Sequence, residues 1–333
     1  MARMATDMGA LCDDLLAETA DLEVLVAGID ESGWATATPA EGWDVKDQVG
    51  HLAYFDDRAR ESMTDRDGFI AHREEVLAHP NFADRMADES RRFDGPKTLA
   101  WFRRARAALI EAARDTDPSL RVPWYGPDMS AASSITARIM ETWAHGQDVA
   151  DALGAARAPS DRLRHVAFIG ARALPNSYQA RGLQAPDSSV RVELEAPSGD
   201  VWAFGPEGAP DSVRGPALDF CLAVTQRRHL ADLELDVEGP VAREWMSIAQ
   251  AFAGPPGSGR RPGQFAEALT GREAEVLALL ARGLSNAEIA ENLGLSIETI
   301  RTHVKHVYMK TGARDRAHAV IIAYETGLAG HAD

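Results

Sequence analysis

Apolar residues recur every three or four positions through most of the first 185 residues, a spacing that predicts amphipathic helices. The stripes are strongest over four segments, which cover about Leu11–Leu25, the stretch after Val45, Trp101–Ala108 and Ile135–Leu153. Four long helices of this kind favour a helical bundle. The end signals that we expect are Asp44 as the cap of the second helix, Pro96 in the first turn of the third, and Ser133 or Ser134 as the cap of the fourth.

Beyond residue 186 the pattern changes from helical spacing to alternation. The run VRVELEAPSGDVWAFGP, residues 190–206, alternates like a hairpin that turns at Ser198–Gly199. A helix from about Pro216, a strand at LELDV and a helix through Trp245 follow. This order predicts a small α+β domain.

The clearest break in the chain is the run GPPGSGRRPGQ, residues 254–264, because its proline and glycine cannot continue a helix or a strand. We interpret it as a linker and expect four regions: a helical bundle over 1–186, the α+β domain over 187–254, the linker over 255–264, and a helical domain over 265–333. The predicted fold class is therefore multidomain and mainly α.

Periodicity in the last region predicts a short helix with Ile289 and Leu293, a tight turn at Gly294, and a further helix capped by Ser296. Ile300, Val304 and Val307 would face a core. On the opposite side lie Arg301, Thr302, Lys305 and His306, which offer donors for base edges and cations for phosphates. The alternative is an ordinary three-helix unit with a solvated face.

Charge and composition limit the classes of protein that fit. The 333 residues are 45% hydrophobic and 26% charged, with a net charge of −16, which argues against general affinity of the whole surface for nucleic acid or membranes. No run is long enough to span a membrane, no signal-peptide core is visible, and two cysteines are too few for a disulfide framework, so we expect a cytoplasmic protein. Positive charge concentrates locally, at Arg301, Lys305, Lys310, Arg314 and Arg316.

The segments LTGREAEVLALLARGLSN, AEIAENLGLS and ETIRTHVKHVYMKTG resemble the LuxR/GerE-type helix-turn-helix domain, with Gly271 where that family commonly has Pro. The resemblance implies that the helix 297–310 enters the major groove of a double-stranded DNA operator and that the final helix pairs two subunits. The expected DNA contacts are Thr299, Arg301, Thr302, Lys305, His306 and Lys310. The expected homodimer contacts are Ala317, Val320, Ile321 and Tyr324.

The stretch ETWAHGQDVAD places Glu141, His145 and Asp148 on one stripe of the fourth helix. This stripe is either a solvated face or part of a metal site. A glutamate and a histidine one turn apart can bind the same ion, but zinc normally needs at least three protein ligands. Spacing alone leaves both interpretations open.

The motifs GWDVKDQVGHLAYFDD and METWAHGQDVADALG resemble the DinB-like metal-binding bundle of mycothiol-dependent maleylpyruvate isomerases, a likeness that extends over most of residues 1–260. The resemblance implies Zn2+, or another divalent metal, held by His51, Glu141 and His145, with Asp148 beside them as a neighbouring or additional ligand. It also implies an active-site arginine, for which Arg227 and Arg228 are the nearest candidates. For these two we favour a solvated helix end. We expect His165, Trp43 and Trp143 to serve packing.

Two functions from different classes follow. The first is a DNA-binding transcription regulator whose metal-containing bundle senses an unknown small molecule. The alternative is a thiol-dependent metalloenzyme, an isomerase or transferase, fused to a DNA-binding domain. A third interpretation, an oligomerisation scaffold that has lost its site, is disfavoured by the intact His51, Glu141 and His145. The fused helix-turn-helix favours the first.

Overall fold

The structure is a computed structural model that describes residues 7–40, 42–78, 91–252 and 271–311, with residues 269, 313, 316, 319, 320 and 323. The chain divides into two compact units, formed mainly by residues 1–257 and 258–333. The predicted linker at 255–264 lies outside the described residues, as do Ala317, Ile321 and Tyr324 of the predicted dimer contacts. None of the helices in the described part of the chain could cross a membrane.

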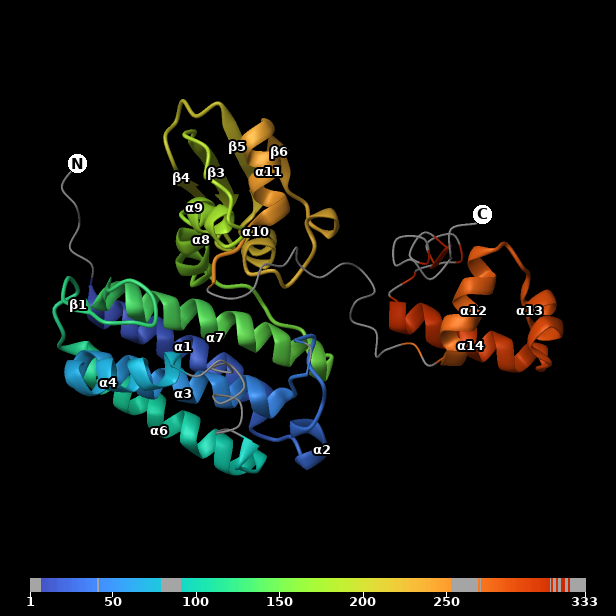
Figure 1. The fold of residues 1–333 in the computed structure, drawn as a ribbon, viewed down its shortest axis with the longest axis horizontal. Helices are drawn as coiled ribbons and strands as arrows, with labels where there is room; N and C mark the ends of the chain where they lie inside the picture. The colour runs from blue at the N-terminus through green and yellow to red at the C-terminus, as the bar shows by residue number, and fades with distance from the viewer. Residues whose placement is uncertain are drawn as a thin grey trace. The chain divides into compact units, whose positions relative to one another are not determined.

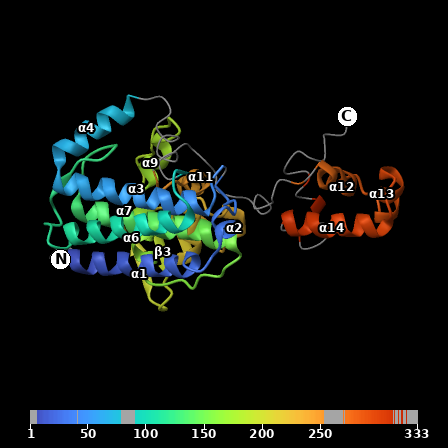
Figure 2. The same cartoon turned by 90° about the horizontal axis from the view of Figure 1, so that it is seen from below.

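The first unit contains the predicted bundle. Its long helices are α1 (Met8–Val26), α3 (Val45–Thr64), α6 (Gly95–Arg114) and α7 (Ala131–Leu153), and they lie side by side (Figures 1 and 2). Apolar side chains from all four fill the interior, with Leu15, Leu52, Phe102 and Val149 fully buried. Each such side chain contributes roughly 1.5–3 kcal/mol to folding. The shorter helices α2 (Glu31–Trp34) and α4 (Arg66–Leu77) and the strand pair β1 (Arg121–Val122) and β2 (Met129–Ser130) lie between the long helices in the sequence.

The ends of these helices follow the local chemistry. Asp44 caps α3 and Pro96 lies in the first turn of α6, both as predicted. The structure adds a capping box between Asp44 and Asp47. The prediction for α7 was wrong by one turn. Ser130, the last residue of β2, is extended, and its hydroxyl accepts a hydrogen bond from the amide of Ser133, so the helix already begins at Ala131.

A small α+β part completes the first unit. The sheet has the order β4-β3-β5-β6, formed by Val201–Phe204, Val190–Glu195, Asp211–Pro216 and Asp236–Glu238. The hairpin of β3 and β4 is confirmed, but β5, which pairs in parallel with β3, was not predicted because DSVRGP carries Asp, Gly and Pro rather than a clear alternation. The helices of this part are α8 (Leu163–Ala171), α9 (Leu174–Gln179), α10 (Ala217–Val224) and α11 (Pro240–Ile248). A 3-10 turn at Leu230–Asp232 lies between α10 and β6 in the sequence. Helix α8 packs against both α7 and α10 and so joins the sheet part to the bundle.

The second unit contains α12 (Gly271–Ala281), α13 (Asn286–Leu293) and α14 (Ile297–Thr311). Between α13 and α14, Gly294 has φ 63°, a left-handed conformation that glycine adopts without a Cβ penalty. The apolar core joins all three helices and includes Ile289, Ile300 and Val304. This is the helix-turn-helix arrangement that the periodicity predicted.

Candidate metal centre and DNA-binding face

Three side chains predicted as metal ligands converge in the bundle. His51 comes from α3, and Glu141 and His145 come from adjacent turns of α7. Their ligand atoms lie within 4.8 Å of one another. Oε2 of Glu141 is 3.4 Å from Nε2 of His51 and 3.1 Å from Nε2 of His145, so both imidazoles face one carboxylate oxygen. The side chains remain 12–23% exposed, which leaves the cluster accessible from solvent.

A chain of hydrogen bonds fixes the proton on His145. The Thr38 hydroxyl donates to the carbonyl of Trp43 and therefore accepts from the side-chain amide of Gln48. The amide oxygen of Gln48 then faces Nδ1 of His145 and accepts a hydrogen bond from its N–H. Neutral His145 consequently presents a lone pair at Nε2, the atom that faces Glu141. An outer hydrogen bond of this kind is what orients metal-binding histidines.

The electrostatics of the cluster suit a cation. Burial, together with the neighbouring His145, lowers the pKa of His51 to about 4, so its ring is neutral at neutral pH. Burial alone would raise the pKa of Glu141, but the contacts of its carboxylate with His145 and His51 outweigh burial and hold that pKa well below its usual range. A carboxylate oxygen and a ring lone pair that face each other at 3.1 Å repel unless a proton or a metal ion lies between them. The residues therefore fit a divalent metal.

Aromatic rings flank the two histidines. The Trp43 ring is stacked on His145 at a centroid distance of 6.1 Å, and Phe55 lies 4.6 Å from His51. Beyond Phe55 come Trp124 and Tyr125, both half-buried. Trp43 was expected to serve packing alone, but its contacts make it part of the wall of the cluster.

Asp148 lies one turn beyond His145, and the structure pairs it with Arg227 rather than placing it among the three converging side chains. The carboxylate of Asp148 is buried, and its Oδ2 is 2.8 Å from Nη2 of Arg227, at the end of α10. Arg227 is only 12% exposed, so the solvated helix end that we favoured for it is wrong. The pair joins the helix that carries the candidate ligands to the α+β part.

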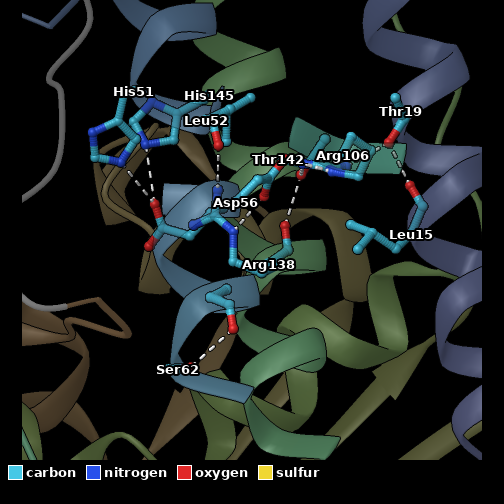
Figure 3. Close-up of polar contacts among 12 residues, drawn as sticks. Leu15, Thr19, His51, Leu52, Asp56, Ser62, Arg106, Arg138, Thr142 and His145 are labelled. Carbon is cyan, nitrogen blue, oxygen red and sulfur yellow. Dashed lines mark hydrogen bonds and ion pairs between the residues drawn. The ribbon is translucent and has the colours of Figure 1, made fainter. Parts of the chain in front are cut away.

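A buried charge network lies next to the cluster (Figure 3) and was not predicted. Asp56 of α3 accepts from Nε of Arg106 at 2.7 Å and from Nε of Arg138 at 2.9 Å, and the three side chains are 0–3% exposed. Arg106 also donates to the hydroxyls of Thr19 and Thr142. The only local signal for this network in the sequence is the acidic run YFDD, and an acidic run of this kind is typical of a solvated face.

The second unit presents the predicted DNA-binding face on α14. Ile300, Val304 and Val307 are buried, whereas Arg301, Thr302 and Lys305 are exposed, and Thr299 and His306 are partly exposed. Arg301 forms an exposed ion pair with Glu298. The side chain of Lys310 lies outside the described residues. Arg316, which the charge pattern grouped with these cations, instead donates to the carbonyl of Leu284 and is half-buried.

A four-helix bundle with a convergent His–Glu–His cluster, followed by a helix-turn-helix unit, defines a DNA-binding regulator with a helical N-terminal domain. Comparison with known proteins agrees. Residues 15–150 match the family described as mycothiol maleylpyruvate isomerase N-terminal domain, and residues 267–323 match the bacterial regulatory proteins of the luxR family.

Individual relatives extend this result. An uncharacterized protein of Mycobacterium tuberculosis is 44% identical over 255 residues, which are 76% of this chain and 99% of the relative. The response regulator protein VraR of Staphylococcus aureus is 45% identical over 62 residues, 19% of this chain and 30% of that protein. The crystal structure of the mycothiol-dependent maleylpyruvate isomerase is similar in fold, with a TM-score of 0.50 and 17% identity over 71% of this chain and 95% of that chain.

The chain therefore belongs to the same family as the Mycobacterium tuberculosis protein. Its residues 15–150 form a domain of the mycothiol maleylpyruvate isomerase N-terminal family, and its residues 267–323 form a luxR-family DNA-binding domain. It is a DNA-binding regulator that carries a mycothiol-related domain. The N-terminal family is metal-binding in general.

Proposed function

We propose that this protein is a one-component transcription regulator whose bundle senses a small molecule through a bound metal. The observation that carries the proposal is the convergence of His51, Glu141 and His145 in the same chain as a helix-turn-helix domain. A transcriptional sensor requires an operator-binding domain, whereas such a domain gives a soluble enzyme no obvious advantage.

The three side chains would hold Zn2+ or another divalent metal as two neutral imidazoles and one carboxylate. Three protein ligands leave a position for an exchangeable group, and the metal would supply Lewis acidity toward a thiolate, carboxylate or hydroxamate. Gln48 holds the His145 ring in the required orientation, while Trp43 and Phe55 restrict the approach to the cluster.

On the DNA side, we propose that α14 enters the major groove, with Arg301 at a base edge and Lys305 at a phosphate. Thr299, Thr302, His306 and Lys310 would add contacts from the same helix. Dimerisation through the final helix would place two such helices on two half-sites. A Val320→Asp change should then lower operator affinity although Val320 contacts no DNA.

Metal content tests the sensing site. Elemental analysis of the purified protein should give about one equivalent of divalent metal, and His145→Ala should lose most of it. His165→Ala is the matched control, because His165 is bonded to Asp14 instead. Equal metal content in all three proteins, or none in the wild type, would remove the metal from the proposal.

Ligand binding tests the sensing role itself. Small thiols, carboxylates and hydroxamates should raise the melting temperature of the wild type, and the responsive compound should change its affinity for a selected duplex. Both effects should vanish in His145→Ala. A compound that binds at the metal without any change in DNA affinity would contradict a regulatory role.

The second candidate function is a thiol-dependent metalloenzyme, an isomerase or transferase. The fold likeness to the isomerase and the buried Asp148–Arg227 pair one turn from His145 favour it. We expect negligible turnover of maleylpyruvate or of model electrophiles in the presence of a low-molecular-weight thiol. Robust turnover that Glu141→Gln abolishes would reverse the order of the two proposals.

A further inference from the structure

The candidate ligands lie on two helices, so the metal site exists only while α3 and α7 keep their alignment. Three cross-helix contacts define that alignment. Gln48 meets His145, His51 meets Glu141, and the third contact joins Arg138 to α3. From the first contact to the third, the residue numbers increase along α3 and decrease along α7, so the two helices run antiparallel. The His51–Glu141 contact lies between the other two.

Arg138 forms the third contact with two hydrogen bonds to α3. Its Nη2 donates to the carbonyl of Leu52 at 3.2 Å, and its Nε donates to Oδ1 of Asp56 at 2.9 Å. Leu52 directly follows His51, and Arg138 precedes Glu141 by three residues, which is one helical turn. Both bonds are therefore made within about a turn of a candidate ligand, and the side chain is 3% exposed.

We propose that Arg138 is a positioning residue for the metal centre: by bonding to Leu52 and Asp56, it sets the register of α3 against α7 that brings His51 to Glu141 and His145. This inference rests on the metal binding proposed above. It assigns to Arg138 an effect on metal affinity although Arg138 does not itself face the ion.

The alternative role of Arg138 is electrostatic, and it predicts the opposite sign. A guanidinium next to the cluster repels a divalent cation, so removal of its charge should tighten metal binding if charge were its main effect. Loss of the cross-helix bonds should weaken metal binding, because His51 would no longer be held against Glu141. The direction of the change therefore separates the two roles.

Arg106 provides the matched control. It donates to the same carboxylate of Asp56 at 2.7 Å and is equally buried, but it comes from α6. It reaches α7 only at the Thr142 hydroxyl and so connects α3 to α7 through a third helix, whereas Arg138 joins the two helices directly. Removal of either arginine leaves Asp56 with one guanidinium. Arg138→Met and Arg106→Met thus each remove one buried positive charge, and each leaves Asp56 paired with the one remaining arginine.

The experiment uses the full-length protein and Zn2+ in competition with a chromophoric chelator, with visible spectra of the Co2+ form as a second measurement. Arg138→Met should weaken Zn2+ binding by about tenfold or more and change the intensity of the Co2+ bands, as expected when an outer contact that orients metal ligands is lost. Arg106→Met should leave affinity within about twofold and the spectrum unchanged. Circular dichroism and urea unfolding verify that both variants fold.

Several outcomes overturn the inference. Equal weakening in both variants would show a general loss of stability, and unchanged or tighter binding in Arg138→Met would show that only charge matters.

If Arg138→Met does not fold, Arg138→Lys replaces it. That variant keeps the charge but cannot bridge Leu52 and Asp56 with a planar fork, so weaker Zn2+ binding is expected, and wild-type affinity would contradict the inference. Absence of Zn2+ binding in the wild type would instead refute the proposed metal site itself.

Discussion

In the helical bundle, the candidate ligands His51 and Glu141 are 90 positions apart and meet only because two helices pack together. In the second unit, all the residues proposed for DNA contact lie on the 15-residue helix α14, and Arg301, Thr302 and Lys305 among them are exposed. The first site converges on a point inside a fold, whereas the second is spread over the outside of one helix. Substitutions should therefore act differently in the two regions.

In the bundle, the candidate ligands depend on contacts between helices, so one change disturbs both stability and binding. On α14, the side chains that would bind DNA are separate from Ile300, Val304 and Val307, which hold the helix in place. A change there should reduce binding and leave the fold intact. The four predictions below test this difference.

The largest effect is expected at Asp56. Asp56→Ala leaves two arginines buried without their carboxylate and should lower the free energy of unfolding of the first unit by about 3–5 kcal/mol. All seven tryptophans precede residue 246, so tryptophan fluorescence in urea reports on this unit alone. Glu111→Ala, an exposed change on α6, should stay within about 0.5 kcal/mol. Equal midpoints for the two variants would show that the network contributes little.

A change at Gln48 should affect metal binding more than folding. Gln48→Leu removes the acceptor for Nδ1 of His145 and frees the ring, so metal affinity should fall roughly 10–100-fold, or about 1.4–2.7 kcal/mol. Gln147→Leu on α7 is the control, because Gln147 is bonded to Asp151 and not to the cluster. Chelator competition measures both. Similar affinities in the two variants would contradict the orienting role of Gln48.

On the DNA side, Arg301→Ala should cost roughly 1–3 kcal/mol of operator affinity and relax the preference at one position. Lys305→Ala should weaken binding to selected and scrambled duplexes alike and reduce the salt slope by about one. Arg272→Ala, exposed on α12, serves as the control. Binding isotherms over a salt series measure these effects, and wild-type affinity in a folded Arg301/Lys305 double variant would refute the assignment of α14.

The smallest effect is expected at the start of α13, where Ser285 and Glu288 form a capping box. Ser285→Ala should destabilise this helix by about 1 kcal/mol, and therefore raise local hydrogen exchange roughly fivefold. Asn292→Ala, on the exposed side of the same helix, should change exchange much less. Unchanged exchange in Ser285→Ala would show that packing alone holds α13.

The same contrast explains how much could be predicted from the sequence. The helix-turn-helix depends on local periodicity and one turn, so Ile300, Val304, Val307 and Gly294 were predictable from spacing. In the bundle, spacing grouped Glu141 and His145 with Asp148, which the structure pairs with Arg227 instead, and His51 required a family resemblance.

Tertiary pairings were beyond local patterns. Gln48, Arg138 and the contact between Asp148 and Arg227 depend on which helices lie together, and none of these side chains differs locally from a solvated one. Strand β5 was missed for a related reason: its place in the sheet follows from parallel pairing with β3, which no short pattern reveals.

Gln48, which bonds His145, donates to the Thr38 hydroxyl, and that hydroxyl donates to the main-chain carbonyl of Trp43. The orientation of the His145 ring is therefore set by the backbone. The tautomer is consequently chosen when the chain folds. An incoming ion would find the Nε2 lone pair already in place, and no ring rotation or proton exchange would need to precede coordination. The rate of metal uptake should then be governed by how fast the ion sheds its own water.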